Sequence, residues 1–246
     1  METNPAVLLE RHEGWAEIVL NRPERRNAID GALADGLHEA LATVRADDTL
    51  RAVVLRGAGG AFCSGLDLKA FGATPTPTWV PGFGAHWRAV HVALASLRPV
   101  LLVALERFAI NGGAALVLAG DLAVCGEGAF LQVAEIRLGM AAPNNLAWLR
   151  LRHPESVAAR LVLTGDRVGA AELLRLGVVG EVVADDAVLA RCRERAVDLA
   201  SLPAAGVSAM KPSMRAAWMG TSPEAWFAAF AAPALAPFGA PAAVRT

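Results

Sequence analysis

Two glycine-bearing segments, each directly after an apolar run, constrain this chain most. Residues 57–68 (GAGGAFCSGLDL) follow the apolar residues 52–55, and residues 108–115 (FAINGGAA) follow the apolar residues 100–105. Glycine lets the backbone approach another segment or a ligand closely, and the start of a helix leaves N–H groups without intrahelical partners. Two such N–H groups that converge on one point would form an oxyanion hole. We therefore expect the functional site where these two segments meet.

The order of predicted elements favours an α/β fold, because strand, glycine turn and helix recur along the chain. Residues 6–20 alternate in polarity and predict an antiparallel ribbon, and residues 30–45 have the apolar spacing of an amphipathic helix. The proline-rich residues 74–82 predict a mobile surface loop. From about residue 203 onward the chain is alanine-rich and predicted to be helical, with a proline-punctuated tail.

Composition excludes several classes of protein. The net charge of −1 gives no basic field for nucleic acid. Residues 108–120 are uncharged but too short to span a bilayer, and three prolines interrupt residues 225–244. The first residues lack a basic-then-apolar signal, so we expect a cytoplasmic protein without a membrane partner. A hydrophobic fraction of 54% is compatible with burial between subunits.

Cofactor and metal motifs are also missing from the sequence. The three cysteines (Cys63, Cys125 and Cys192) have no CxxC spacing and are predicted to be reduced thiols, and no histidine pair has metal-ligand spacing. Residues 57–62 lack the third glycine of a dinucleotide fingerprint, and no GK(S/T) follows. Ser64 is not flanked by the glycines of a nucleophile elbow. We expect neither a metal site nor a separate cofactor.

Four segments, in order, resemble the motifs of one enzyme family. They are residues 21–29 (NRPERRNAI), residues 62–68 (FCSGLDL), residues 132–139 (QVAEIRLG) and residues 163–179, which begin with LTG and end with LGVV. Together they resemble the crotonase family, the enoyl-CoA hydratases and isomerases. The resemblance implies a crotonase-like spiral of ββα units over residues 1–200. It further implies a helical trimerisation region with a Pro/Ala-rich tail over residues 201–246, and a homotrimer or hexamer.

The resemblance also implies a chemistry. The carbonyl oxygen of an acyl-CoA substrate would lie between the backbone N–H groups of Leu66 and Gly112, where an enolate is stabilised. Glu135 occupies the position of a family acid–base glutamate, whereas Ala115 stands where hydratases have a second one. Burial of Glu135 would raise its pKa into the range of a general base. The alternative for Glu135 is a surface ion pair with Arg137.

One carboxylate leaves three functions open. Moving a double bond from carbon 3 to carbon 2 needs a single base, so the chain resembles the Δ3,Δ2-enoyl-CoA isomerases. The second possibility is a hydratase in which Glu135 and an ordered water molecule suffice. The third is a catalytically weak acyl-CoA-binding protein that kept the fold.

Further residues are assigned to the substrate through the same resemblance, and CoA is treated as part of that substrate. Arg25 and Arg26 would contact the nucleotide, while Ala28, Asp67 and Leu68 would line the adenine and pantetheine path. The remaining predicted contacts are Ser64, Gly65, Gly113, Pro143 and Asn144.

For several polar residues the sequence leaves both a functional and a structural role open. Asn144 or Asn145 could orient the substrate or a water molecule, or could cap a helix while Trp148 lies in the core. His86 and His91 could assist proton transfer or could be ordinary surface and core histidines. The family's C-terminal motif that covers CoA is missing here, and Lys211 and Phe227 are the residues that could replace it.

Overall fold

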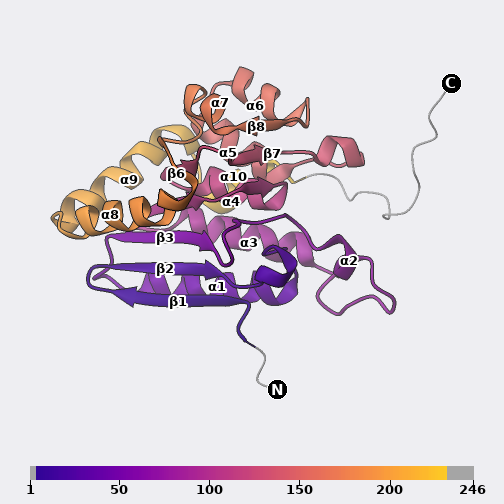
Figure 1. The fold of residues 1–246 in the computed structure, drawn as a ribbon, viewed down its shortest axis with the longest axis horizontal. Coiled ribbons are helices and arrows are strands. Elements are labelled where there is room, and N and C mark those ends of the chain that lie inside the picture. Colours follow the sequence, from indigo (N-terminus) through magenta and orange to yellow (C-terminus); the bar gives the residue numbers. More distant parts are fainter. Residues whose placement is uncertain (1–3, 232–246) are drawn as a thin grey trace.

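The computed structural model describes residues 4–231, and the predicted tail over residues 232–246 lies outside them. The predicted α/β class is confirmed. The strands form a six-stranded sheet and a smaller three-stranded sheet. Figure 1 shows how the strands and helices are stacked. The larger sheet has the order β1 (Val7–His12), β2 (Trp15–Leu20), β3 (Ala52–Gly57), β4 (Val100–Leu105), β6 (Leu122–Gly126) and β9 (Glu181–Val183). The smaller sheet has the order β5 (Phe108–Ile110), β7 (Phe130–Gln132) and β8 (Arg167–Gly169).

The N-terminal ribbon is antiparallel, as predicted. Val7 pairs with Leu20 at one end and His12 with Trp15 at the turn. From β2 to β9 every neighbouring pair in the larger sheet is parallel. Parallel strands require crossover connections, which cover the sheet with helices and explain why the central strands are apolar on both faces.

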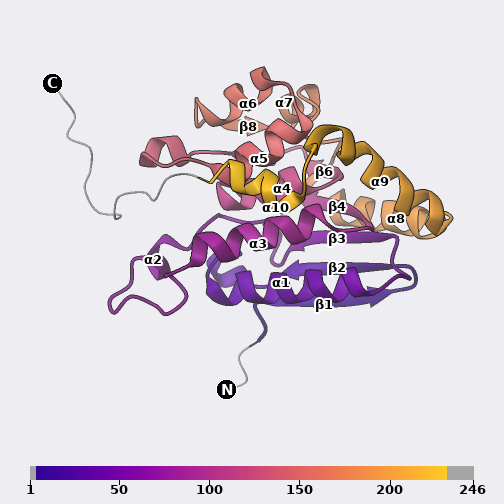
Figure 2. The same cartoon turned by 180° about the vertical axis from the view of Figure 1, so that it is seen from behind.

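Helices cover both faces of the larger sheet, as the two opposite views show (Figures 1 and 2). One face packs against α1 (Gly31–Ala46), α3 (Phe83–Ala95) and α4 (Gly112–Ala119), and the other against α8 (Val188–Ala200). The start of α1 is set by Asp30, whose side chain accepts a hydrogen bond from the Leu33 amide at 3.0 Å. The helix predicted over residues 30–45 is confirmed.

A surface loop joins α2 (Leu68–Phe71) to α3, where residues 74–82 predicted one. Trp79 fixes this loop, since its ring centroid lies 5.3 Å from that of Phe83. The same indole lies on Gly31 at the start of α1, where an added Cβ would come within 2.5 Å of Trp79 Cγ. Gly31 therefore provides the space into which the loop is anchored.

The remaining helices lie in the second half of the chain, whereas the 3-10 turns are spread along it. The helices are α5 (Pro143–Arg152), α6 (Glu155–Val162), α7 (Ala170–Arg175), α9 (Ala204–Met219) and α10 (Pro223–Ala229), and the 3-10 turns are η1 (Pro23–Arg25), η2 (Glu135–Leu138) and η3 (Asp185–Ala187). The helical character predicted beyond residue 203 is confirmed by α9 and α10. No helix in residues 4–231 is both long enough and apolar enough to cross a bilayer.

A buried carboxylate ties α9 to the sheet. Asp121 Oδ2 lies 2.6 Å from Lys211 Nζ, while Oδ1 lies 2.7 Å from Arg215 and 3.1 Å from Arg152. Lys211 is 4% exposed, and its ammonium group also donates to the Pro99 carbonyl at 2.7 Å. Phe227 of α10 is likewise buried, packed on Trp148 with ring centroids 5.1 Å apart. Both residues thus act in the packing of this chain.

Candidate active site

The two glycine segments lie side by side. Cys63 and Ala109 form a parallel β-bridge. The Cys63 amide donates to the Phe108 carbonyl at 3.2 Å, and the Ile110 amide donates to the Cys63 carbonyl at 3.1 Å. The meeting point predicted from the sequence is therefore formed by direct backbone pairing.

Glycine is required at two positions of this contact. Gly65 has a φ of 85°, and a Cβ there would lie 2.7 Å from the Ile110 carbonyl oxygen. A Cβ on Gly113 would lie 2.7 Å from the carbonyl oxygen of Cys63. Real side chains do not tolerate such distances, so both residues are glycines for close packing. Neither belongs to the lining of the two cavities described below, although both were predicted as substrate contacts.

The predicted oxyanion donors face no competing acceptor. Within residues 4–231, the backbone N–H groups of Leu66 and Gly112 make no hydrogen bond. Leu66 follows the positive-φ residue Gly65, and Gly112 is the first residue of α4. The first N–H groups of a helix have no intrahelical acceptor and carry the positive end of its dipole. Both donors are free to bind an anionic oxygen.

Asn111 directly precedes α4 and positions its first turn. It was not among the predicted site residues. Its φ of 51° and ψ of −113° are unusual for a residue that is not glycine. Four hydrogen bonds fix this conformation: its N–H donates to Gln132 O at 2.8 Å, its Oδ1 accepts from Ala134 N at 2.8 Å, and its carbonyl accepts from Ala115 N and from the side chain of Asn145. Backbone strain held by its surroundings is typical of functional sites. The sequence feature that could have identified Asn111 is its place directly before two glycines at the start of a helix.

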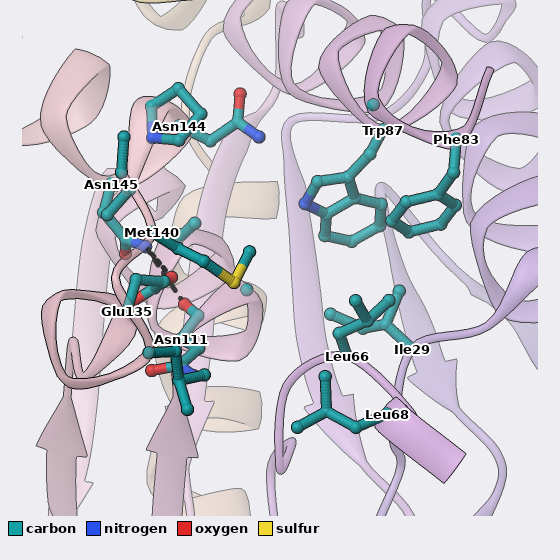
Figure 3. A pocket seen from close by; sticks show the side chains of 17 residues that line it. Ile29, Leu66, Leu68, Phe83, Trp87, Asn111, Glu135, Met140, Asn144 and Asn145 are labelled. Atoms are coloured by element: carbon teal, nitrogen blue, oxygen red, sulfur yellow. Dashed lines mark hydrogen bonds between the residues drawn. The ribbon is translucent and has the colours of Figure 1, made fainter. Parts of the chain in front are cut away.

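A cavity of about 190 Å³ opens beside these donors. Figure 3 shows its two walls, with apolar side chains of Ile29, Leu66 and Leu68 facing the polar groups of Glu135 and Asn145. The predicted residues that line this cavity are Leu66, Leu68, Gly112, Glu135, Pro143 and Asn144. Ala115 lines it as well, so the position of the second family glutamate adds only a methyl group.

Glu135 has the surroundings of a general base. Its side chain is 8% exposed, and burial raises the pKa of this carboxyl from its ordinary value to about 7. Arg137 does not neutralise it, because Arg137 Nη2 lies 2.8 Å from Asp166 Oδ1. The alternative of a surface Glu135–Arg137 ion pair is therefore wrong. Among the described residues that line the cavity, Glu135 alone has a titratable side chain.

Asn145 contacts Glu135 directly. Its Nδ2 donates to Glu135 Oε1 at 3.1 Å and to the Asn111 carbonyl at 3.2 Å, and the residue is 2% exposed. The helix-cap reading of the asparagines is wrong, because α5 begins after Ala142 and has no side-chain cap. The expected burial of Trp148 is confirmed.

A second cavity of about 410 Å³ adjoins the first, because Leu66 and Leu68 line both. Its lining includes six of the predicted CoA contacts, together with Glu24 and Lys69. The six are Arg25, Arg26, Ala28, Ser64, Asp67 and Leu68, of which Leu68 also lines the first cavity. The predicted substrate residues thus form two groups, one around Glu135 and one beside the arginines.

The carboxylate of Asp67 is already paired with groups of the protein itself. Its carboxylate lies 2.9 Å from Arg25 Nη2 and accepts from the Ala70 amide at 3.1 Å, which caps α2. Burial alone would raise the pKa of Asp67, but the hydrogen bonds from Ala70 and Arg25 outweigh it and hold that pKa below its ordinary value. Asp67 therefore positions Arg25, while the guanidinium group of Arg26 makes no ion pair within residues 4–231.

Neither histidine of α3 lines the cavity. His86 Nε2 lies 2.9 Å from Asp35 Oδ1 near the surface. His91 is fully buried, and its Nδ1 accepts from Trp148 Nε1 at 2.9 Å. Burial lowers the pKa of His91 to about 3, so this imidazole is neutral. The core reading fits His91 better than a role in proton transfer.

Known proteins share this arrangement of sequence and fold. Residues 10–229 match the family model described as enoyl-CoA hydratase/isomerase. A carnitinyl-CoA dehydratase of Proteus mirabilis is 34% identical over 203 residues, which cover 81% of this chain and 76% of that protein. The crystal structure of an enoyl-CoA hydratase from Mycobacterium smegmatis superposes with a TM-score of 0.77 at 31% identity, covering 85% of this chain and 81% of the other.

A second solved structure has a different activity in its description. A monofunctional enoyl-CoA isomerase from M. smegmatis is 31% identical, with a TM-score of 0.71 and coverage of 88% of this chain and 94% of the other. The crotonase-like fold predicted from the motifs is thus confirmed. The chain belongs to the enoyl-CoA hydratase/isomerase family of enzymes.

Proposed function

We propose that Glu135 transfers protons on an acyl-CoA thioester whose carbonyl oxygen is held by the N–H groups of Leu66 and Gly112. The reaction that this site supports best is the shift of a double bond from carbon 3 to carbon 2. The acyl group would occupy the 190 Å³ cavity, and CoA would extend past Leu66 and Leu68 into the second cavity. Arg25 and Arg26 would meet its phosphates there.

The proposed reaction needs only one base, because the proton that Glu135 removes is the one that it returns. Glu135 takes a proton from carbon 2, and the electrons of that C–H bond pass into the thioester, whose oxygen becomes anionic. The two backbone N–H groups stabilise this dienolate, and one such donor contributes about 3 kcal/mol to transition-state stabilisation. The protonated Glu135 then returns the proton to carbon 4 while the double bond forms between carbons 2 and 3.

The main observation behind this proposal is that, among the described residues that line the cavity, Glu135 alone has a titratable side chain. Ala115 adds only a methyl group to the lining. A pKa of about 7 suits a group that must both accept and return a proton at neutral pH. The isomerase among the similar structures supports the same reading.

Hydration of a 2-enoyl thioester is the second candidate. The relative named carnitinyl-CoA dehydratase and the enoyl-CoA hydratase structure support it. Within the site, the specific support is Asn145, a polar side chain in contact with Glu135 at 3.1 Å.

Mass spectrometry of 2-enoyl-CoA and 3-enoyl-CoA esters incubated with the protein separates the candidates. Conversion of the 3-enoyl ester without change of mass supports isomerisation, and a gain of one water supports hydration. Glu135→Gln should abolish either reaction, whereas Glu172→Gln, at an exposed glutamate paired with Arg175, should abolish neither. Recovery of every ester unchanged would favour the catalytically weak binding protein.

A homotrimer or hexamer in the cytoplasm stays part of the proposal. The mass in solution, measured by sedimentation, tests the assembly. A monomer at micromolar concentration would contradict it.

A further inference from the structure

Two buried oxygen atoms at the site have no hydrogen-bond partner. Within residues 4–231 these are Glu135 Oε2 and Asn145 Oδ1, which belong to two side chains already joined by a hydrogen bond. A buried polar group without a partner destabilises the folded protein. Buried polar groups in native proteins nearly always have a partner, so such a pair indicates a site for an ordered water molecule or a ligand group.

The orientation of the Asn145 amide follows from its neighbours. Its NH₂ group faces two acceptors, Glu135 Oε1 at 3.1 Å and the Asn111 carbonyl at 3.2 Å. A primary amide has two N–H donors, and both are used here. Turning the amide over would place its oxygen against these acceptors, so Oδ1 is the atom left without a partner.

Each of the two unpaired oxygens accepts hydrogen bonds, so a group that pairs with either of them must be a donor. Oε2 of an ionised carboxylate and Oδ1 of an amide both accept. Water and hydroxyl groups carry the donor that such a pair needs, and a water molecule has two. The wall opposite is apolar, with Ile29, Leu66 and Leu68 across the cavity (Figure 3).

We propose that Asn145 is a positioning residue that fixes Glu135 through its amide nitrogen and, through its amide oxygen, receives an O–H group at carbon 3 of the acyl chain. The group is either the water that adds to a 2-enoyl thioester or the hydroxyl that leaves a 3-hydroxyacyl thioester. This inference rests on the proposed function, since it assumes that Glu135 and the oxyanion donors act on an acyl-CoA thioester.

One glutamate can then serve both ends of a hydration. The water oxygen bonds to carbon 3, its proton passes to Glu135 Oε2, and the π electrons move into the thioester to give the enolate. Glu135 returns the same proton to carbon 2, so that a C–O and a C–H bond replace the π bond and one O–H bond. Asn145 Oδ1 accepts the hydrogen that stays on the oxygen, which holds the water while the other hydrogen is transferred.

The test compares two reactions in the same variants. Proton exchange at carbon 2 of a saturated acyl-CoA, followed in D₂O, needs Glu135 and the oxyanion donors but no O–H group. Hydration of a 2-enoyl-CoA, and dehydration of the 3-hydroxyacyl-CoA, need the O–H group as well. Asn145→Leu keeps the shape of the side chain and removes both of its polar atoms. Asn145→Asp keeps oxygen acceptors of the same shape but removes the N–H donors.

We expect Asn145→Leu to lower hydration and dehydration about 100-fold while exchange at high pH stays within about threefold of the original protein. The pH at which exchange reaches half its maximum should rise by about one unit, because the carboxylate loses a hydrogen bond. In Asn145→Asp it should rise further, because two carboxylates then face each other. Asn21→Leu is the matched control, since its side chain donates to the Pro5 carbonyl in the N-terminal ribbon.

Equal losses in exchange and hydration, with an unmoved pH profile in both variants, would show that Asn145 is merely structural and would overturn the inference. Exchange without any hydration or dehydration in the unaltered protein would also overturn it, and would leave isomerisation as the reaction. Absence of exchange in the unaltered protein would instead remove the proposed function, and the inference with it. The two failures are thus distinguishable. Thermal melts of each variant show that it is folded before the rates are compared.

Discussion

The α-carbon of Gly113 faces the carbonyl oxygen of Cys63 so closely that an added Cβ would lie 2.7 Å from it. This contact joins the start of α4 to the segment that carries Leu66. The spacing of the two proposed oxyanion donors therefore depends on the missing side chain of Gly113, which does not itself line the cavity. A site built from backbone groups is sensitive to backbone displacement, and the first prediction tests this.

Gly113→Ala should reduce turnover about 100-fold and lower the free energy of unfolding by about 2 kcal/mol. The added methyl group must push the two segments apart, which separates the N–H groups of Leu66 and Gly112. Steady-state kinetics and urea denaturation measure the two effects. Gly206→Ala is the control, because a Cβ there meets no atom within 4 Å. Equal activity of both variants would contradict the role given to the contact.

Glu135→Gln should make the protein more stable above pH 7. Burial raises the pKa of Glu135 to about 7, so between its ordinary value and pH 7 the folded chain holds a proton that the unfolded chain releases. The free energy of unfolding therefore falls as pH rises through this window, by on the order of 2 kcal/mol. The glutamine variant lacks this loss, and urea denaturation at pH 5 and pH 8 would reveal the difference.

Glu172→Gln should change stability in the opposite direction from Glu135→Gln. The hydrogen bond from Arg175 lowers the pKa of Glu172, so this exposed carboxylate contributes its small stabilisation above the unfolded pKa and loses it as pH falls. Replacing it should bring a slight loss of stability at pH 8. The prediction for Glu135 fails if its variant gains nothing at pH 8 relative to pH 5.

His91 should remain neutral over the working range of the enzyme. Burial lowers its pKa to about 3, and Nδ1 already accepts from the indole of Trp148. NMR of the ¹⁵N-labelled imidazole should show no titration of this ring between pH 8 and pH 5. His91→Phe should cost about 2 kcal/mol of stability, because the buried Trp148 N–H loses its acceptor. The pH–rate profile of this variant should match that of the original protein. A shifted profile would indicate that His91 takes part in proton transfer.

Arg26→Gln should raise the KM for an acyl-CoA about threefold at low salt and leave kcat unchanged. In the proposed complex, the exposed guanidinium group would contribute less than about 1 kcal/mol through an ion pair with the phosphates of CoA. The matching acyl-pantetheine thioester lacks the nucleotide and serves as the control, since its KM should not change. A similar increase for both thioesters would place the effect of Arg26 elsewhere, for example on the Ser64 amide that donates to its carbonyl at 3.1 Å.

Local chemistry made much of this site readable from the sequence. Glycine, the apolar strand runs and the helix starts act within a few residues of each other, so the segments around Gly65 and Gly112 were located correctly. The antiparallel ribbon and the helix after Asp30 followed from the periodicity of apolar residues alone, and the structure adds the Asp30 cap. The position of Glu135 came from its motif, and only the fold shows that Arg137 turns away from it toward Asp166.

Contacts between distant segments were decided by the tertiary structure. Asn145 lies 3.1 Å from Glu135 because α5 packs beside η2 and α4, and no pattern in its own segment distinguishes it from Asn144. Asp121 gathers three cations from α5 and α9, which places Lys211 in the interior. The sequence by itself identified the two glycine segments and, through the family resemblance, the candidate donors Leu66 and Gly112 and the single glutamate Glu135, because motifs of this kind depend on residue type and local conformation. Which polar side chains lose water and meet depends on how remote elements pack, and the tertiary structure alone decided it.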